Sequence, residues 1–137
     1  MQFCITFFLY LCYNTQGDYF MNYSKENVSL IQLDLDNERS EYELNAIKLT
    51  MDGCKEESQY ILKIIEVYRE VSDLLDKTYN VDKDKFLASL KEEYIKERDY
   101  YLSHFHNFDD LGDSFISGLK LEYLDMLYTK VVNRINL

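Results

Sequence analysis

The amino-acid sequence predicts a mainly α-helical protein that folds as a compact bundle of three or four helices. The chain has 137 residues, with no proline and only four glycines, so few positions force it to turn. From residue 38 onward, apolar residues recur about every 3.6 positions, as on one face of a helix. We therefore expect a single domain over residues 1–137. It comprises an N-terminal apolar segment (1–36) and a helical bundle (38–137).

The first residues of the chain favour a small β element as an alternative to helix. Residues 3–12, "FCITFFLYLC", are nearly all apolar, and the "NTQG" that follows suits the turn of a β-hairpin. The run is too short to span a bilayer, which requires about 20 residues. It therefore predicts a buried element that opens the fold, either a hairpin or part of a sheet of two to three strands.

Residues 27–36 can be interpreted in two ways. Ile31, Leu33 and Leu35 alternate with polar residues, and this period of two predicts a half-buried strand. Val28, Ile31 and Leu35 also share one face of a helix. A wholly helical protein is therefore the alternative to a protein with an N-terminal sheet.

The rest of the chain predicts helices in succession. Four groups of apolar residues have helical spacing and predict four helices, and Gly53 marks a break between the first two. Asp82 is a suitable N-cap for the helix that follows, and Asp113 or Ser114 for the last one. The apolar residues of these four helices are Leu44, Ile47, Met51 and Cys54; then Ile61, Ile64, Tyr68, Val71 and Leu75; then Leu87, Leu90, Tyr94, Tyr101 and Phe105; and finally ten of the seventeen residues from Leu119 to Ile135. Because the last helix is apolar on most sides, we expect it to be central.

The charge of the chain limits the classes of partner. Fifteen basic and 25 acidic residues give a formal net charge of −10. Such a chain does not attract nucleic-acid phosphates or an anionic membrane surface, because both are bound by Lys and Arg. It does attract a protein with a basic surface.

One segment of the chain concentrates this acidity. It contains Asp34, Asp36, Glu38, Glu41 and Glu43 against a single Arg39. Such a run usually forms a solvated face. If the acidic run is instead a binding surface, its carboxylates mimic phosphates and occupy the basic groove of a nucleic-acid-binding protein. Three further aspartates extend the patch if the fold brings them close: Asp109, Asp110 and Asp113.

The stretch "RDYYLSHFH" holds both histidines of the chain. Arg98 and His104 are separated by five residues, which resembles the HEPN superfamily signature, an Arg and a His with roughly four to six residues between them. HEPN proteins are small helical ribonucleases that dimerise so that two such motifs share one cleft. The resemblance implies that Arg98 and His104 act on the RNA phosphate and its 2′-hydroxyl, or that the chain is an inactive relative.

Geometry makes the ribonuclease the second hypothesis. Six positions along an ideal helix place Arg98 and His104 about 120° apart around the axis. A metal site at His104 and His106 is a further alternative, but helical ligand pairs usually sit three or four residues apart. The sequence has no Gly-rich phosphate loop and no Ser or Cys nucleophile with a nearby base, so we expect no cofactor.

The three cysteines bear on the cellular compartment. Cys4, Cys12 and Cys54 have no metal-ligand spacing and leave one thiol unpaired, which favours a reducing, cytoplasmic setting. Secretion with cleavage near Gly17 is the alternative, because small residues there follow an apolar run.

Taken together, these features favour a small acidic helical protein that binds another protein and inhibits or regulates it. An inhibitor, immunity or antitoxin-like factor, or a phage-encoded antagonist of host defence, has this composition. The mechanism would be occlusion without catalysis, and the protein itself is either a monomer or a homodimer. The two alternatives are the HEPN-like ribonuclease and a secreted helical effector.

Overall fold

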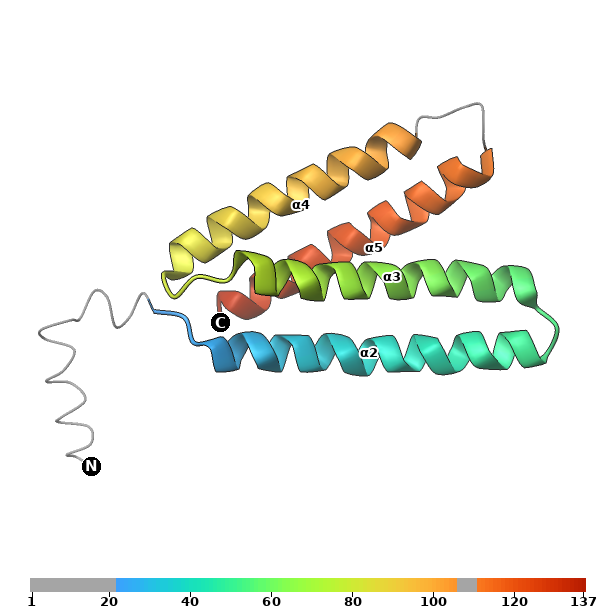
Figure 1. The fold of residues 1–137 in the computed structure, drawn as a ribbon, viewed down its shortest axis with the longest axis horizontal. Helices are drawn as coiled ribbons and strands as arrows, with labels where there is room; N and C mark the ends of the chain where they lie inside the picture. The colour runs from blue at the N-terminus through green and yellow to red at the C-terminus, as the bar shows by residue number, and fades with distance from the viewer. Residues whose placement is uncertain (1–21, 106–110) are drawn as a thin grey trace, which may run out of the picture.

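A computed structural model of the chain describes residues 22–105 and 111–137, and in these ranges the protein is a bundle of four helices (Figure 1). The helices are α2 (Lys25–Met51), α3 (Lys55–Thr78), α4 (Lys83–Phe105) and α5 (Leu111–Ile135). The described residues contain no strand, only an isolated bridge between Asn22 and Asp82. The predicted helical fold class is thus confirmed, while the hairpin expected within residues 1–20 lies outside the described residues.

The four helices form two antiparallel pairs. Helix α2 packs mainly on α3, and α4 packs mainly on α5. The pairs join where α5 packs on α3, and α2 meets α5 only weakly. In Figure 1, α4 and α5 diverge from α3 toward the end where they are connected, and α2 forms the lower edge of the molecule. Helix α2 therefore has one neighbour along most of its length.

The strand predicted over residues 27–36 is wrong, because these residues form the start of α2. The alternation at Ile31, Leu33 and Leu35 has another cause. Ile31 and Leu35 are buried in the core, whereas Leu33 is 53% exposed on the far side of the helix. A helix with apolar residues on two opposite faces imitates the period of a strand over a short window.

The helix ends follow ordinary capping chemistry. Ser24 caps α2 by accepting a hydrogen bond from the Asn27 amide at 3.2 Å. Asp82 caps α4 as predicted, with its Oδ1 accepting from the amide of Asp84 at 3.0 Å. Helix α5 begins at Leu111, before both of the predicted caps, and the Ser114 hydroxyl donates to the Phe105 carbonyl at 2.6 Å instead of capping.

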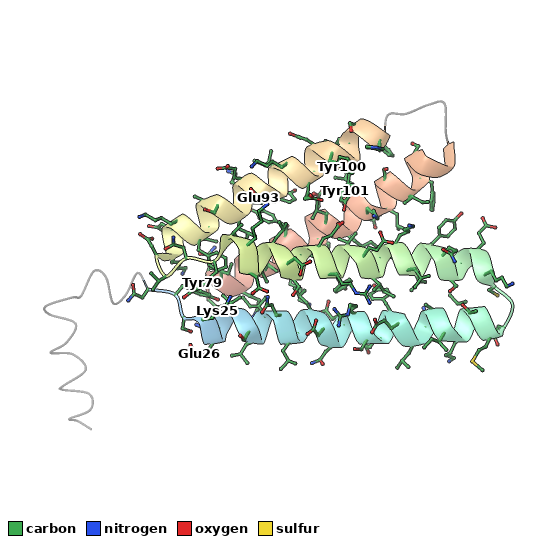
Figure 2. All side chains as sticks on the ribbon, in the orientation of Figure 1. Lys25, Glu26, Tyr79, Glu93, Tyr100 and Tyr101 are labelled. Carbon is green, nitrogen blue, oxygen red and sulfur yellow. The ribbon has the colours of Figure 1, made fainter. Side chains whose placement is uncertain are left out.

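Residues before α2 are fixed to the loop between α3 and α4. The Tyr23 amide donates to the Val81 carbonyl at 2.7 Å, and the Tyr79 hydroxyl donates to the Tyr23 carbonyl at 2.6 Å. The Lys25 ammonium lies 4.9 Å from the centre of the Tyr79 ring, and both residues are labelled in Figure 2. These contacts hold the N-terminus of α2 in place.

The core lies between the two pairs, and all four helices contribute to it. Every helix contributes fully buried side chains to it: Val28 and Leu35 from α2, Val67 and Leu75 from α3, Phe86 and Leu90 from α4, and Leu124, Leu127, Val131 and Ile135 from α5. Helix α5 contacts the other three helices, as expected of a helix that is apolar on most sides, and α3 likewise contacts all three.

Candidate functional site

Helix α2 carries two apolar stripes on opposite sides. One stripe faces the core through Val28, Ile31, Leu35 and Ala46. The other consists of five side chains that are each more than half exposed, and we call it the outward stripe: Leu30 (54%), Leu33 (53%), Leu44 (64%), Ile47 (56%) and Met51 (80%). At about 100° per residue, the two stripes lie roughly 180° apart around the helix axis. Figure 2 shows side chains projecting from the edge of α2 that faces away from α3.

The outward stripe has the spacing of a helix–helix interface. Its members occupy positions 30, 33, 44, 47 and 51, and Asn37 and Ser40 fill the two intermediate positions of the same three-and-four pattern. Leu44, Ile47 and Met51 form the stripe that was recognised in the sequence. Leu30 and Leu33 were missed because they were interpreted as part of a strand.

A groove between α2 and α3 adjoins the outward stripe. Its volume is about 930 Å³. Buried Ala46 and Ile65 line it together with the more exposed Leu44, Met51 and Leu62. The sequence indicated nothing at Leu62, because a helix surface commonly carries single apolar residues.

Small residues bring α2 and α3 together beside this groove. The Ser58 hydroxyl donates to the Ala46 carbonyl at 3.1 Å and lies 2.7 Å from the Thr50 hydroxyl. The helices are joined through Gly53, whose φ of +84° is a left-handed conformation that favours glycine. The close approach leaves the larger apolar side chains at the surface.

The predicted acidic run does not form one face. Helical geometry places Asp34, Glu38 and Glu41 on one side of α2, and Asp36 and Glu43 on the other. Glu38 is engaged within the bundle, where it accepts a hydrogen bond from the Tyr68 hydroxyl at 3.0 Å and pairs with Lys130. Burial is the main cause that raises the pKa of Tyr68.

The other carboxylates of the run flank the outward stripe. Asp34 pairs with Arg134 of α5. Asp36 lies 3.3 Å from Arg39, and Glu43 lies 3.3 Å from Arg69 of α3. Glu41 is exposed. The apolar stripe is thus bordered by carboxylates on both sides, and most of them are oriented by a cation of the same chain. Asp109, Asp110 and the side chain of Asp113 lie outside the described residues.

Arg98 and His104 contact different groups. Arg98 Nε lies 3.5 Å from Asp125 Oδ1, which also accepts a hydrogen bond from the Tyr94 hydroxyl at 2.6 Å. Burial, followed by the bond to Asp125, raises the pKa of Tyr94 to about 12. His104 Nδ1 lies 3.0 Å from the Tyr100 carbonyl. Arg98 thus pairs with an acidic residue of α5, the helix on which α4 packs. The ribonuclease hypothesis stays a prediction.

The described residues contain no cluster of side chains that could form the alternative metal site. Over residues 22–105 and 111–137, no three His, Cys, Asp or Glu side chains are placed to hold a metal ion. His106 lies outside the described residues.

Over residues 22–105 and 111–137, no helix is both long enough and apolar enough to cross a membrane.

One titratable pair inside the bundle was not predicted. Glu70 of α3 accepts a hydrogen bond from the hydroxyl of Tyr101 of α4, whose side chain is only 3% exposed. Burial is the main cause that raises the pKa of Glu70. Lys120 of α5 lies beside them, with its ammonium 2.8 Å from Glu66 and 5.6 Å from the centre of the Tyr101 ring. This arrangement links three helices and is structural in character.

Comparison of the chain with protein-family models, with curated proteins and with solved structures finds no match. Its function therefore has to be argued from its own residues. Among the described residues, α2 carries more exposed large apolar side chains than any other helix, and the groove adjoins them.

Proposed function

We propose that this protein acts by binding another protein through the outward stripe of α2 and the adjoining groove. The observation that supports this is the set of five large apolar side chains, each more than half exposed, on the side of α2 opposite the core. Exposed apolar patches of this kind mark interaction sites in soluble proteins. The arrangement fits helix-in-groove recognition, in which apolar side chains at helical spacing are buried between two chains.

The energetics of the face are compatible with regulated binding. Complete burial of a large aliphatic side chain contributes roughly 1.5–3 kcal/mol, and the members of the stripe are already partly covered. Association costs at least about 4 kcal/mol in lost translational and rotational freedom. The apolar stripe alone therefore supports weak to moderate binding, and a tight complex requires polar and charged contacts along its border.

The charge of the protein adds to the proposal. A net charge of −10 steers a basic partner toward the molecule and raises the association rate at low salt. Occupation of a basic functional surface would block that surface by steric and electrostatic means. The protein would then act as a non-catalytic inhibitor or regulator, and the antagonist of a nucleic-acid-binding protein is the case that its charge suits best.

Site-specific photo-cross-linking in the native host tests the proposal. A photoreactive amino acid replaces Ile47 in the outward stripe, or Ile95 on α4 as a matched control, since Ile95 is also apolar and 43% exposed. We expect one abundant cross-linked protein from position 47 that is missing from position 95, identified by mass spectrometry. If both positions give the same background, α2 is not the binding face.

A further inference from the structure

We infer that the occupant of the outward stripe is a cationic amphipathic helix of a partner protein. This inference rests on the proposed function, because it specifies the partner of the same surface. It depends on three properties of α2: the length and spacing of the stripe, its polar centre, and the charge of its border.

Length and spacing indicate a helix as the occupant. The stripe runs from Leu30 to Met51 on a single straight helix, which corresponds to about 32 Å or three heptads. A partner helix of similar length covers it when apolar residues recur every three and four positions. The groove beside Leu44 and Met51 can accept larger side chains from the same helix.

The centre of the stripe is polar. Asn37 and Ser40 interrupt it and leave one apolar patch at Leu30 and Leu33 and another at Leu44, Ile47 and Met51. An apolar residue opposite Asn37 would bury an amide without a hydrogen-bond partner, which is costly. The partner helix therefore carries polar side chains in its middle turns, and this requirement fixes its register, as polar layers do in coiled coils.

The border of the stripe is anionic at its surface. Asp36 is 47% exposed, whereas Arg39, which pairs with it, is 25% exposed. Asp34 is 44% exposed and its partner Arg134 is 33% exposed. At Asp34 and Asp36 the carboxylates thus lie nearer to solvent than the cations that hold them, whereas at Glu43 (39% exposed) the partner Arg69 (59%) is the more exposed. Lys and Arg residues on both edges of a partner helix would complement them.

The same charges disfavour a second copy of this chain. An antiparallel pair of α2 helices can match apolar with apolar layers by placing Leu30 opposite Ile47 and Leu33 opposite Leu44. That register brings Asp36 of each copy beside Glu43 of the other. Like charges directly across an interface destabilise it. At these positions a cationic partner helix places opposite charges together, whereas a second copy of the chain would place like charges together.

Binding of designed peptides to the full chain tests the inference. Three fluorescently labelled helical peptides are compared by anisotropy at low salt. The first has Leu at the heptad positions, Gln in the two middle layers and Lys on both edges. The second carries Glu in place of Lys, and the third has the composition of the first in scrambled order. We expect the first peptide to bind at least about tenfold more tightly than either of the others.

Two variants of the protein assign the binding to the stripe and to its border. Leu44→Gln with Ile47→Gln should abolish binding of the Lys peptide. Asp34→Asn, Asp36→Asn and Glu41→Gln together should weaken it by about tenfold and flatten its salt dependence. The matched control removes three exposed carboxylates of α4 and should change binding by less than about threefold: Asp84→Asn, Glu92→Gln and Asp99→Asn.

Several outcomes would overturn the inference. Equal binding of the Lys and Glu peptides, lost in Leu44→Gln with Ile47→Gln, would keep the binding face and reject its charge chemistry. Equal binding of the ordered and scrambled Lys peptides would reject helix recognition. Absence of binding by all three peptides would also reject it, and the cross-linking experiment at Ile47 would then decide the proposed function separately.

Two other coverings of the outward stripe would each give a distinct experimental result. If the chain sediments as a dimer that Leu44→Gln with Ile47→Gln converts to a monomer, a second copy covers the stripe. If Ile47→Cys forms an intrachain disulfide with Cys4 or Cys12, the N-terminal residues of the chain cover it. Either result would overturn the inference, whereas a monomer without such a disulfide agrees with it.

Discussion

Helices α2 and α5 both carry apolar residues on opposite sides, yet they occupy different places in the molecule. Helix α5 packs on all three other described helices, and Leu124, Leu127, Val131 and Ile135 are at most 1% exposed. Helix α2 packs mainly on α3, and its second apolar stripe is exposed. The comparison teaches that an all-round apolar helix indicates a need for several neighbours. For α5 the chain supplies most of them, with Phe115 and Met126 left 52% and 48% exposed, and for α2 we propose that a partner does.

The largest expected effect separates the two helices by stability. Leu124→Ala removes a side chain that is 1% exposed and should lower the free energy of unfolding by about 2–5 kcal/mol. Leu44→Ala, at 64% exposure, should lower it by less than about 0.5 kcal/mol. Urea denaturation followed by circular dichroism measures both. Similar losses for the two variants would mean that the outward stripe is covered in the free protein.

The second effect concerns the tyrosines buried between the helices. Burial raises the pKa of Tyr68 and of Tyr101 above the ordinary value of about 10. A pKa that is higher in the folded state means that the associated stability is present below pH 10 and is lost as the pH rises further. We expect cooperative alkaline unfolding, in which the last tyrosines to ionise do so at the pH at which the helix signal is lost. Ionisation of all 13 tyrosines well before the helices melt would contradict this.

A smaller effect of the same sign, in a lower pH range, is expected at Glu70. Burial raises the pKa of its carboxyl, so its charged form is disfavoured in the folded protein. This contribution to stability is present below the unfolded pKa of about 4.3 and is lost as the pH rises through the folded value. Glu70→Gln should therefore stabilise the protein at pH 7 and make no difference at pH 4 or below. Denaturant melts at the two pH values test this, and Glu92→Gln on the exposed side of α4 is the control.

The smallest expected change in stability belongs to the outward stripe itself. Leu44→Gln with Ile47→Gln should leave the melting temperature nearly unchanged, since substitutions at exposed positions usually alter stability by less than about 0.5 kcal/mol. The same variant should lose the cross-linked partner, when the photoreactive residue is placed at Met51 instead of Ile47. A stable variant that keeps its partner would show that the apolar face of α2 is not used.

The fold was largely predictable because a helix with one apolar face is recognisable from apolar residues that recur about every 3.6 positions. The regular spacing from Ile61 to Leu75 predicted α3, and Ile64, Tyr68, Val71 and Leu75 of this series are buried. In α5, Leu124 is buried, whereas Tyr128 is partly buried and stacks on Tyr94 with ring centres 3.9 Å apart. The start of α2 was not predictable in the same way, because apolar residues on two faces blur the helical period.

The proposed binding face was less predictable than the fold. Periodicity shows that Leu44, Ile47 and Met51 share a face, but it does not show which face turns to the core. That depends on where α3 and α5 lie, which is a property of the whole bundle. The acidic run was visible in the sequence, whereas its division between two sides of α2 requires the helix. Its cations Arg134 and Arg69 come from other helices.

The order in which the helices pair has a consequence for the timing of recognition. Helix α2 pairs with α3 and α4 with α5, so each pair joins neighbours along the chain through a short connection. Helical bundles with such local contacts fold within microseconds to milliseconds. A partner at micromolar concentration is encountered only after roughly 0.1–10 s at ordinary association rates. The outward face of α2 would therefore be complete before the proposed partner arrives, and the proposed recognition would proceed by docking to a preformed surface.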